Sequence, residues 1–381
     1  MKLRTYARSG AIVAAIALTF SGLAACGSSS ESGADGTKSI MIGVSGPYTG
    51  PSAAFGPLIE NGLKTGFKDN GSDGVQFKLV SKDDACSPEK AVTVVQGFLT
   101  SDLNATFGPG CSGALSATQK MMASAKMVHI SGGYQATLTK NDDGYYFRTV
   151  PNDTQLTSAM ADYISELGHK KLALVHDDTS YGTSGADEFT KNAESRGLDV
   201  TYNGEYKYGS TDFSGQVVRI RDAKPDAIVL QGYEGDLGQL VKQIRKLGLK
   251  QPIFGPTAMG NPEFVAAAGA AANGVVFTSN YVRGNPETAD FSKKFKDTYK
   301  MDLTDVAAAA YLGGVAFAEA FKTLDSDASG DVLVKTIRGL DIQTPLGRIS
   351  FDDKGDLTHP PILIGTVKDG KTELVKDLSK K

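Results

Sequence analysis

Two pairs of adjacent carboxylates stand where apolar runs of the chain end. Asp83-Asp84 follows one such run, and Asp177-Asp178 follows another with His176 directly before it. Paired carboxylates can act as general acid and base or hold Mg²⁺, and a histidine beside them could serve as a base. The same residues also build turns and cap helices, which is the interpretation we favour. We then expect His176 to hold neighbouring loops by hydrogen bonds.

Other enzyme signatures fail on their context. Residues 365–372 match the phosphate-loop pattern as a string, but too few residues follow for the helix that such a loop requires. The run Gly110-Cys111-Ser112-Gly113 lacks the spacing of a hydrolase nucleophile elbow, and no GxGxxG follows the first strand-like run. We therefore expect no enzyme and no cofactor.

The first 25 residues are organised like an export signal. Basic residues precede a short apolar stretch over residues 11–20, and small residues lead up to Cys26. The stretch is too short and too rich in Ala and Gly for a transmembrane helix. The run Leu23–Cys26 resembles the lipobox of bacterial lipoproteins, in which the cysteine is lipidated and becomes the first mature residue. This predicts a signal peptide over 1–25 and a lipid anchor that holds the protein at the outer face of the bacterial cell membrane.

Composition narrows the remaining possibilities. The net charge is −3 and basic residues are interleaved with acidic ones, which argues against nucleic acid as a partner. The 381-residue chain is longer than one core usually supports, so two domains are expected. Residues 26–37 are mostly Gly, Ser, Ala and Asp, and predict a flexible tether.

The cysteines agree with export. Once Cys26 is assigned to the anchor, Cys86 and Cys111 remain as one pair in an oxidising compartment. A disulfide between them would stabilise the fold by about 3–4 kcal/mol, and free thiols are the alternative. The four histidines show no metal-ligand spacing with either cysteine, so we expect no metal site.

Apolar strand-like runs alternate with amphipathic helix patterns, in two series. This alternation predicts an α/β protein with parallel sheets that carry helices on both faces. Residues 362–375 are typical of a hairpin that turns at Asp369-Gly370. The other expected strands are 40–44, 75–80, 105–107, 127–130, 171–176, 198–206, 226–231 and 252–254. The expected helices are 88–99, 112–124, 155–167, 184–196, 213–221, 237–247, 288–299, 305–324 and 331–337.

Ligands bind beyond the carboxyl ends of the strands in such sheets, so we expect function in the loops that leave the strands. Most of these loops combine glycine with a hydroxyl or aromatic side chain. Glycine lets backbone N–H groups approach a ligand, and tyrosine offers an apolar wall with a polar tip. The loops, which predict a small-molecule pocket, are 43–56, 108–113, 131–135, 177–182, 232–234 and 255–260.

A series of short motifs carries a family resemblance. The motifs are Asp83–Val92, Gly108–Ser112, Val175–Asp177 with Tyr181-Gly182, Gly232-Tyr233, Gly255-Pro256 and Asp352–Leu357. In this order and spacing the chain resembles the leucine/isoleucine/valine-binding proteins over nearly all of residues 38–366. Those proteins are substrate-binding components of ABC importers with the type I periplasmic-binding fold.

The resemblance implies two doubly wound, Rossmann-like lobes joined by a three-strand hinge, with the ligand in the cleft between them. The first lobe would comprise 38–151 plus 282–362, and the second 152–281 plus 363–381. It also implies that Cys111 is the second cysteine of a family disulfide. Ser112 would hold the ligand carboxylate, because a helix N-terminus favours an anion. The implied pocket positions are Phe55, Ser112, Gly133, Tyr134, Tyr181, Tyr233 and Thr257.

Thr257 departs from the family pattern. Amino-acid-binding members place a carboxylate after the Gly-Pro of the second lobe, where it pairs with the ligand ammonium. An ammonium without a partner in a closed cleft would be costly. Either Glu234, Asp236 or Asp305 replaces that carboxylate, or the ligand lacks an α-ammonium, as an amide, a keto acid or an aromatic acid would.

These observations predict a monomeric, lipid-anchored substrate-binding protein of an ABC importer. It would capture a small apolar amino acid, or a related amide or carboxylate, and deliver it to the permease. The alternative is a sensory or regulatory receptor on the same fold, without transport. A secreted hydrolase is disfavoured because no nucleophile is evident.

Overall fold

The computed structural model describes residues 37–140 and 144–380. The expected signal peptide, Cys26 and all of the expected tether except Thr37 lie outside these residues. Within the described ranges, no helix is both long and apolar enough to cross a membrane.

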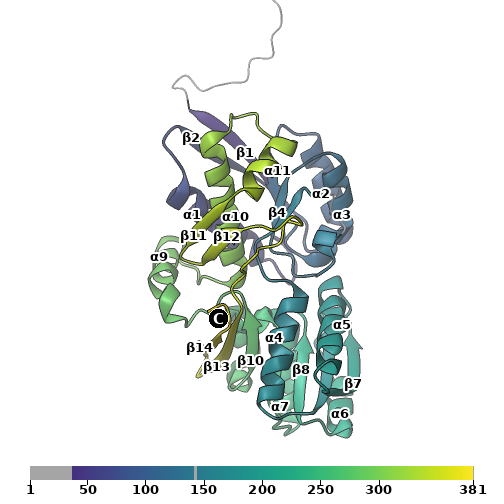
Figure 1. Cartoon of the computed structure of the whole chain (residues 1–381). Helices are drawn as coiled ribbons and strands as arrows, with labels where there is room; N and C mark the ends of the chain where they lie inside the picture. Colours follow the sequence, from purple (N-terminus) through teal and green to yellow (C-terminus); the bar gives the residue numbers. More distant parts are fainter. Residues whose placement is uncertain (1–36, 141–143, 381) are drawn as a thin grey trace, which may run out of the picture. The chain divides into compact units, whose positions relative to one another are not determined.

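The described chain builds two sheets dominated by parallel strands, which confirms the expected α/β architecture (Figure 1). The first sheet has five parallel strands in the order β2-β1-β3-β4-β5. They are β1 (Lys38–Gly46), β2 (Val75–Asp83), β3 (Ala105–Phe107), β4 (His129–Ser131) and β5 (Tyr146–Arg148). We call this sheet and the helices that pack on it the first lobe.

The helices of the first lobe come from two distant parts of the chain. The late helices bury their apolar side chains in the same core as β1 and α1, as Figure 1 also shows. The first-lobe elements beyond the sheet are α1 (Phe55–Asn70), α2 (Pro88–Leu99), α3 (Ser112–Ser124), η1 (Leu138–Lys140), η4 (Pro286–Thr288), α9 (Ala289–Tyr299), α10 (Asp305–Thr323), α11 (Gly330–Arg338) and the hairpin of β11 (Asp341–Thr344) and β12 (Gly347–Ser350).

The second sheet has seven strands in the order β14-β13-β10-β9-β8-β6-β7 and defines the second lobe. The predicted C-terminal hairpin is confirmed and adds two antiparallel strands to this sheet. The strands are β6 (Lys171–Asp177), β7 (Asp199–Tyr206), β8 (Ala227–Gln231), β9 (Ile253–Gly255), β10 (Val276–Ser279), β13 (Leu363–Lys368) and β14 (Lys371–Asp377). The helices are α4 (Asp153–Glu166), α5 (Ser180–Glu194), α6 (Ser214–Ala223), α7 (Glu234–Lys246), η2 (Thr257–Gly260), α8 (Pro262–Ala268) and η3 (Gly269–Ala272).

The chain passes between the two lobes three times, after β5, after β10 and after β12. This connectivity places α9, α10 and α11 on the first lobe although they follow the strands of the second. We propose lobe boundaries near residues 151, 281 and 362, within these passages.

Helix α1 is the largest element that the sequence did not predict. Gly62 and Gly66 lie where α1 packs closely against α10. A Cβ atom on Gly62 would collide with the carbonyl oxygen of Ala307, and one on Gly66 with that of Tyr311. The glycines therefore serve helix packing. The short strands β5, β10, β11 and β12 and helix α8 were also not predicted.

Two helices begin three or more residues earlier than predicted. Helix α5 starts at Ser180 rather than 184, because the hydroxyl of Thr179 caps it by accepting from the N–H of Gly182 at 3.1 Å. Helix α7 starts at Glu234 rather than 237. The earlier starts put Tyr181 and Glu234 in first helical turns, close to the carboxyl ends of β6 and β8.

A disulfide joins Cys86 to Cys111, with their Cα atoms 5.4 Å apart. It ties the loop after β2 to the residue that immediately precedes α3. The carboxylate of Asp84 supports the same loop by accepting from the N–H of Cys86 at 2.9 Å. The N-terminus of α3 is thus fixed by a covalent bond to a neighbouring loop.

Replacing both cysteines by serine should lower the free energy of unfolding by about 3 kcal/mol, because the unfolded chain regains the freedom of a 25-residue loop. Urea denaturation of the oxidised wild type and of the double variant measures the difference. Ser116→Ala, an exposed change on α3, serves as a control. A loss below 1 kcal/mol would contradict a stabilising role for this bond.

Candidate ligand-binding site

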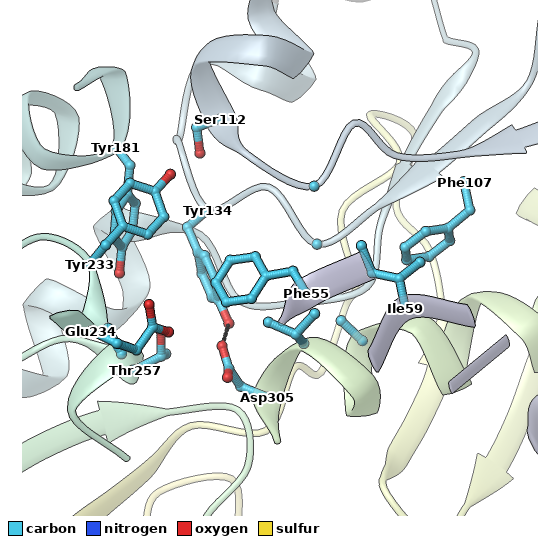
Figure 2. A pocket seen from close by; sticks show the side chains of 15 residues that line it. Phe55, Ile59, Phe107, Ser112, Tyr134, Tyr181, Tyr233, Glu234, Thr257 and Asp305 are labelled. Carbon is cyan, nitrogen blue, oxygen red and sulfur yellow. Dashed lines mark hydrogen bonds between the residues drawn. The ribbon is translucent and has the colours of Figure 1, made fainter. Parts of the chain in front are cut away.

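A cavity lies at the carboxyl ends of the strands, lined by both lobes (Figure 2). It contains about 580 Å³ of space free of atoms, counting the part that opens to solvent. The lining residues are Phe55, Ile59, Phe107, Gly110, Ser112, Gly132, Tyr134, Tyr181, Tyr233, Glu234, Thr257, Ala258, Asp305, Val306 and Ala309.

Helix N-termini from both lobes converge on this cavity. Phe55, Ser112, Glu234 and Asp305 are the first residues of α1, α3, α7 and α10, and Tyr181 is the second residue of α5. The first N–H groups of a helix have no partner within the helix, and its dipole places partial positive charge there. The geometry therefore favours negatively charged groups, either of the protein or of a ligand.

Aromatic rings form the middle of the cavity wall. The ring of Tyr181 lies 5.9 Å from that of Tyr134 and 5.2 Å from that of Tyr233, measured between centroids. Tyr208 continues the series, with its centroid 5.2 Å from that of Tyr233. Figure 2 shows Tyr134, Tyr181, Tyr233 and Phe55 in the middle of the cavity wall. Ser112 lies on one side of them, and the carboxyl groups of Glu234 and Asp305 lie on the other. The wall suits an apolar group of a ligand.

Arg148 fixes the loop that carries Tyr134. Its fully buried guanidinium donates to the carbonyl oxygens of Gly133, Tyr134 and Gln135 at 2.9–3.1 Å. The Nε atom of Arg148 donates to Oδ1 of Asp356 at 2.6 Å, which supplies the charge partner. Arg148 therefore holds this loop through its backbone carbonyl groups, and the Tyr134 side chain lines the cavity.

Asp305 is buried at the cavity beside Tyr134. The Tyr134 hydroxyl lies 2.8 Å from Oδ2 of Asp305 and 2.9 Å from Oδ1 of Asn280. The other carboxylate oxygen of Asp305, Oδ1, is buried and has no hydrogen-bond partner among the described residues. Burial raises the pKa of Asp305, although the hydrogen bonds from Asn261 and Tyr134 act in the opposite direction.

Glu234 is the second buried carboxyl group of the cavity. Its Oε1 accepts from the side-chain amide of Asn261 at 2.8 Å. Burial, and after it the negative charge of Asp305, raises the pKa of Glu234 to about 8. None of the described residues that line the cavity is Lys, Arg or His. The cavity thus has an acidic side with no protein cation to balance it.

The structure brings six of the seven predicted pocket residues to the cavity: Phe55, Ser112, Tyr134, Tyr181, Tyr233 and Thr257. Gly133 does not line it, and its neighbour Gly132 does. A Cβ atom on Gly133 would lie 2.7 Å from Leu138 and 2.9 Å from Leu115, so this glycine packs into the first lobe.

Two of the three carboxylates named as replacements for the missing one also line the cavity, namely Glu234 and Asp305. Asp236 does not, and its Oδ2 accepts from the N–H of Gly209 at 2.7 Å. The sequence missed Ile59 because α1 was not predicted. It missed Val306 and Ala309 because nothing in the pattern of α10 indicates which face meets a cavity.

The paired carboxylates serve turns, as favoured above. Oδ1 of Asp83 accepts from the N–H groups of Tyr48 and Ala85, at 2.8 and 3.0 Å. Oδ1 of Asp177 accepts from the N–H of Thr179 at 3.0 Å, just before α5. Nδ1 of His176 lies 2.8 Å from the carbonyl oxygen of Asp177. Within the described ranges, no group of three or more His, Cys, Asp or Glu side chains could hold a metal ion.

Known proteins share this architecture. Residues 39–372 match the periplasmic binding protein family. The Leu/Ile/Val-binding protein homolog 2 of Brucella abortus is 28% identical over 333 residues, which cover 85% of this chain and 89% of that protein. The resemblance inferred from the motifs is thereby confirmed.

Two solved structures with different ligands are similar to the chain. The branched-chain amino acid transporter substrate binding protein LivJ of Streptococcus pneumoniae, in complex with isoleucine, has a TM-score of 0.80 and 27% identity, covering 89% of this chain and 100% of its own. A solute binding protein of an ABC transporter from Rhodopseudomonas palustris, in complex with 3,4-dihydroxy benzoic acid, has a TM-score of 0.81 and 25% identity, covering 90% and 97%. Because the family match extends over most of its length, this chain belongs to the periplasmic binding proteins, a family of binding proteins rather than enzymes.

Proposed function

We propose that the protein is a substrate-binding lipoprotein of an ABC importer. It captures a small apolar amino acid, or a related amide or carboxylate, between its lobes and delivers it to the membrane permease. The observation that carries this proposal is the polarity of the cavity. The α3 N-terminus with Ser112 lies on one side, tyrosines line the middle, and buried carboxyl groups lie on the other side.

This polarity matches a zwitterion with an apolar side chain. The carboxylate of the ligand would lie at Ser112, where the unpaired N–H groups of α3 and its dipole favour an anion. Isoleucine in the Streptococcus pneumoniae protein and 3,4-dihydroxy benzoic acid in the Rhodopseudomonas palustris protein both carry a carboxylate. The shared group supports an acid as part of the proposed ligand, and we assign it to Ser112 on the geometry of α3.

Lobe closure is the proposed means of capture. The hydroxyl of Ser52, after β1 in the first lobe, lies 3.1 Å from the hydroxyl of Tyr208, after β7 in the second. Residues of both lobes line the cavity, so a ligand gains its full set of contacts only when the lobes are together. Hinge closure of two lobes around a ligand is a common form of such capture.

Calorimetric titration with leucine, isoleucine, valine, their amides and phenylacetate tests the proposed ligand class. At least one of these compounds should bind with a dissociation constant of about 1 µM or below, equivalent to roughly −8 kcal/mol. If none of them binds at millimolar concentration, the proposed class is wrong.

Ser112→Ala should weaken binding of the best of these ligands about tenfold, because a hydrogen bond to a charged carboxylate is worth roughly 1.5–3 kcal/mol. Ser116→Ala is the matched control, since Ser116 is exposed on the same helix and does not line the cavity. Equal effects of the two changes, measured in the same titration, would argue against a carboxylate at Ser112.

Closure predicts a smaller radius of gyration in the presence of ligand, while each lobe keeps its own structure. Small-angle scattering of the mature protein, with and without a saturating amount of the best ligand, measures this change. An unchanged radius at saturation would contradict a hinge-closing receptor.

Cys26→Ser should release the protein from the membrane, because serine cannot form the thioether to the lipid. Fractionation of cells that express the full chain should then find the variant in the medium or periplasm. A variant that stays in the membrane fraction would show that Cys26 is not the anchor.

A further inference from the structure

The two carboxyl groups of the cavity come from different lobes. Glu234 is the first residue of α7, which packs in the core of the second sheet. Asp305 is the first residue of α10, which packs in the core of the first sheet. Both residues line the same cavity, and Figure 2 shows them on the side of the cavity opposite Ser112. Two acidic groups, one from each lobe, therefore line the cavity at the boundary that closes on the ligand.

Each carboxyl group is oriented by neutral donors. The amide of Asn261 donates to Oε1 of Glu234, and the hydroxyl of Tyr134 lies within hydrogen-bonding distance of Oδ2 of Asp305. Asn261 also acts on Asp305, yet Oδ1 of Asp305 has no hydrogen bond of ordinary length and angle to a described residue, although Asp305 is only 4% exposed. A buried carboxylate oxygen without a donor is costly, so this atom is suited to a donor that arrives from outside the protein.

The site offers hydroxyl donors, but no cationic donor is present among the described residues of its lining. The described residues of the cavity wall include no Lys, Arg or His, and Thr257 carries no charge. A carboxylate ligand group would add a third negative charge on this side. A neutral amide could supply a donor but no charge. A ligand ammonium supplies both, and its three N–H donors can reach acceptors on both sides.

Resting on the proposed function, we propose that Glu234 and Asp305 bind one ammonium group of the ligand between them and so join the two lobes through it. We call this pair the carboxylate clasp. It assigns an amino acid as the ligand class and disfavours acids or amides that lack an ammonium. In amino-acid-binding relatives, a carboxylate at the position of Thr257 pairs with the ligand ammonium. The carboxylate clasp would perform this role from two other positions of the fold.

The charge balance of the clasp involves both helices. Two ionised carboxylates and one ammonium leave one excess negative charge. Glu234 and Asp305 begin α7 and α10, and each helix N-terminus contributes roughly half a positive charge. The two dipoles together therefore offset about one charge, which allows both carboxylates to be ionised when the ammonium is present. Without the ammonium, Glu234 takes up a proton instead, in keeping with its raised pKa.

The test compares amino acids with analogues that lack only the amino group. The pairs are leucine with 4-methylpentanoate, isoleucine with 3-methylpentanoate, valine with 3-methylbutanoate, and phenylalanine with 3-phenylpropanoate. Calorimetry of the wild type should show that the best amino acid binds at least 100-fold more tightly than its analogue.

The variants Glu234→Gln and Asp305→Asn keep the shape of each side chain and remove its charge. Each should weaken binding of the amino acid about 10- to 150-fold, as expected for one charged hydrogen bond. Each should change the affinity for the analogue less than threefold, so that the preference for the amino group falls in both variants. Asp236→Asn is the matched control on α7, since Asp236 loses the same charge but does not line the cavity.

Proton release gives a second readout that a loss of packing would not produce. Burial raises the pKa of Glu234 to about 8, so most of this group is protonated at pH 7 before the ammonium arrives. Glu263 also faces Glu234, and the phenols of Tyr134, Tyr181 and Tyr233 stay neutral because burial raises their pKa values well above 10. Titration at pH 7 in buffers of different ionisation enthalpy should show proton release by the wild type, and less by Glu234→Gln.

The possible outcomes separate the clasp from the proposed function. If the wild type binds an analogue as tightly as its amino acid, the clasp is wrong while the proposed receptor stands. If only one of the two variants loses the preference, the ammonium is held by one lobe and the clasp between lobes is wrong. If the wild type binds none of the amino acids, amides or carboxylates, the proposed function fails and the clasp fails with it.

Discussion

The site depends on a constraint of parallel sheets, in which each helix begins where a strand ends. The strand order reverses between β1 and β3 in the first sheet, and between β6 and β8 in the second. At each reversal the connecting helices leave in opposite directions and open a crevice at the carboxyl ends. Phe55 and Ser112 follow the first reversal, and Tyr181 and Tyr233 follow the second. The wall of the cavity is therefore a consequence of strand order.

Much of the fold could be predicted because its elements repeat one local pattern. Helices α2 and α3 have the predicted bounds, since Ser87 caps α2 before a proline and a clear apolar face follows. Helix α1 was missed because Gly62 and Gly66 are needed for close packing against α10, and α10 lies far along the chain. The strands β5 and β10 are fully or largely buried, and a strand of three or four residues is too short to show a period that could identify it.

The site was harder to predict than the fold, because one side of it consists of residues at strand exits and the other side includes a residue that follows no strand. Ser112, Tyr181 and Tyr233 stand at strand exits, and family motifs mark their positions. Asp305 follows no strand exit, and only the tertiary structure brings it to Tyr134. The sequence could name Asp305 as one of three acidic candidates but could not choose between it and Asp236. The difference lies in their partners, since Asp236 accepts from the N–H of Gly209, whereas Oδ1 of Asp305 has no hydrogen bond of ordinary length and angle to a described residue.

The same carboxyl groups make the ligand-free fold less stable than it could be. The pKa of Glu234 rises from 4.5 to about 8 on folding, so the folded protein holds this proton more tightly than the unfolded chain does. Stability therefore falls as pH rises through this interval, and the cost is largely present at neutral pH. The buried guanidinium of Arg148 nearby is paired with the partly exposed carboxylate of Asp356, which shows that the fold can neutralise a charge. At the cavity it leaves the charge unmatched, so a ligand that supplies a cation recovers free energy that the protein alone cannot.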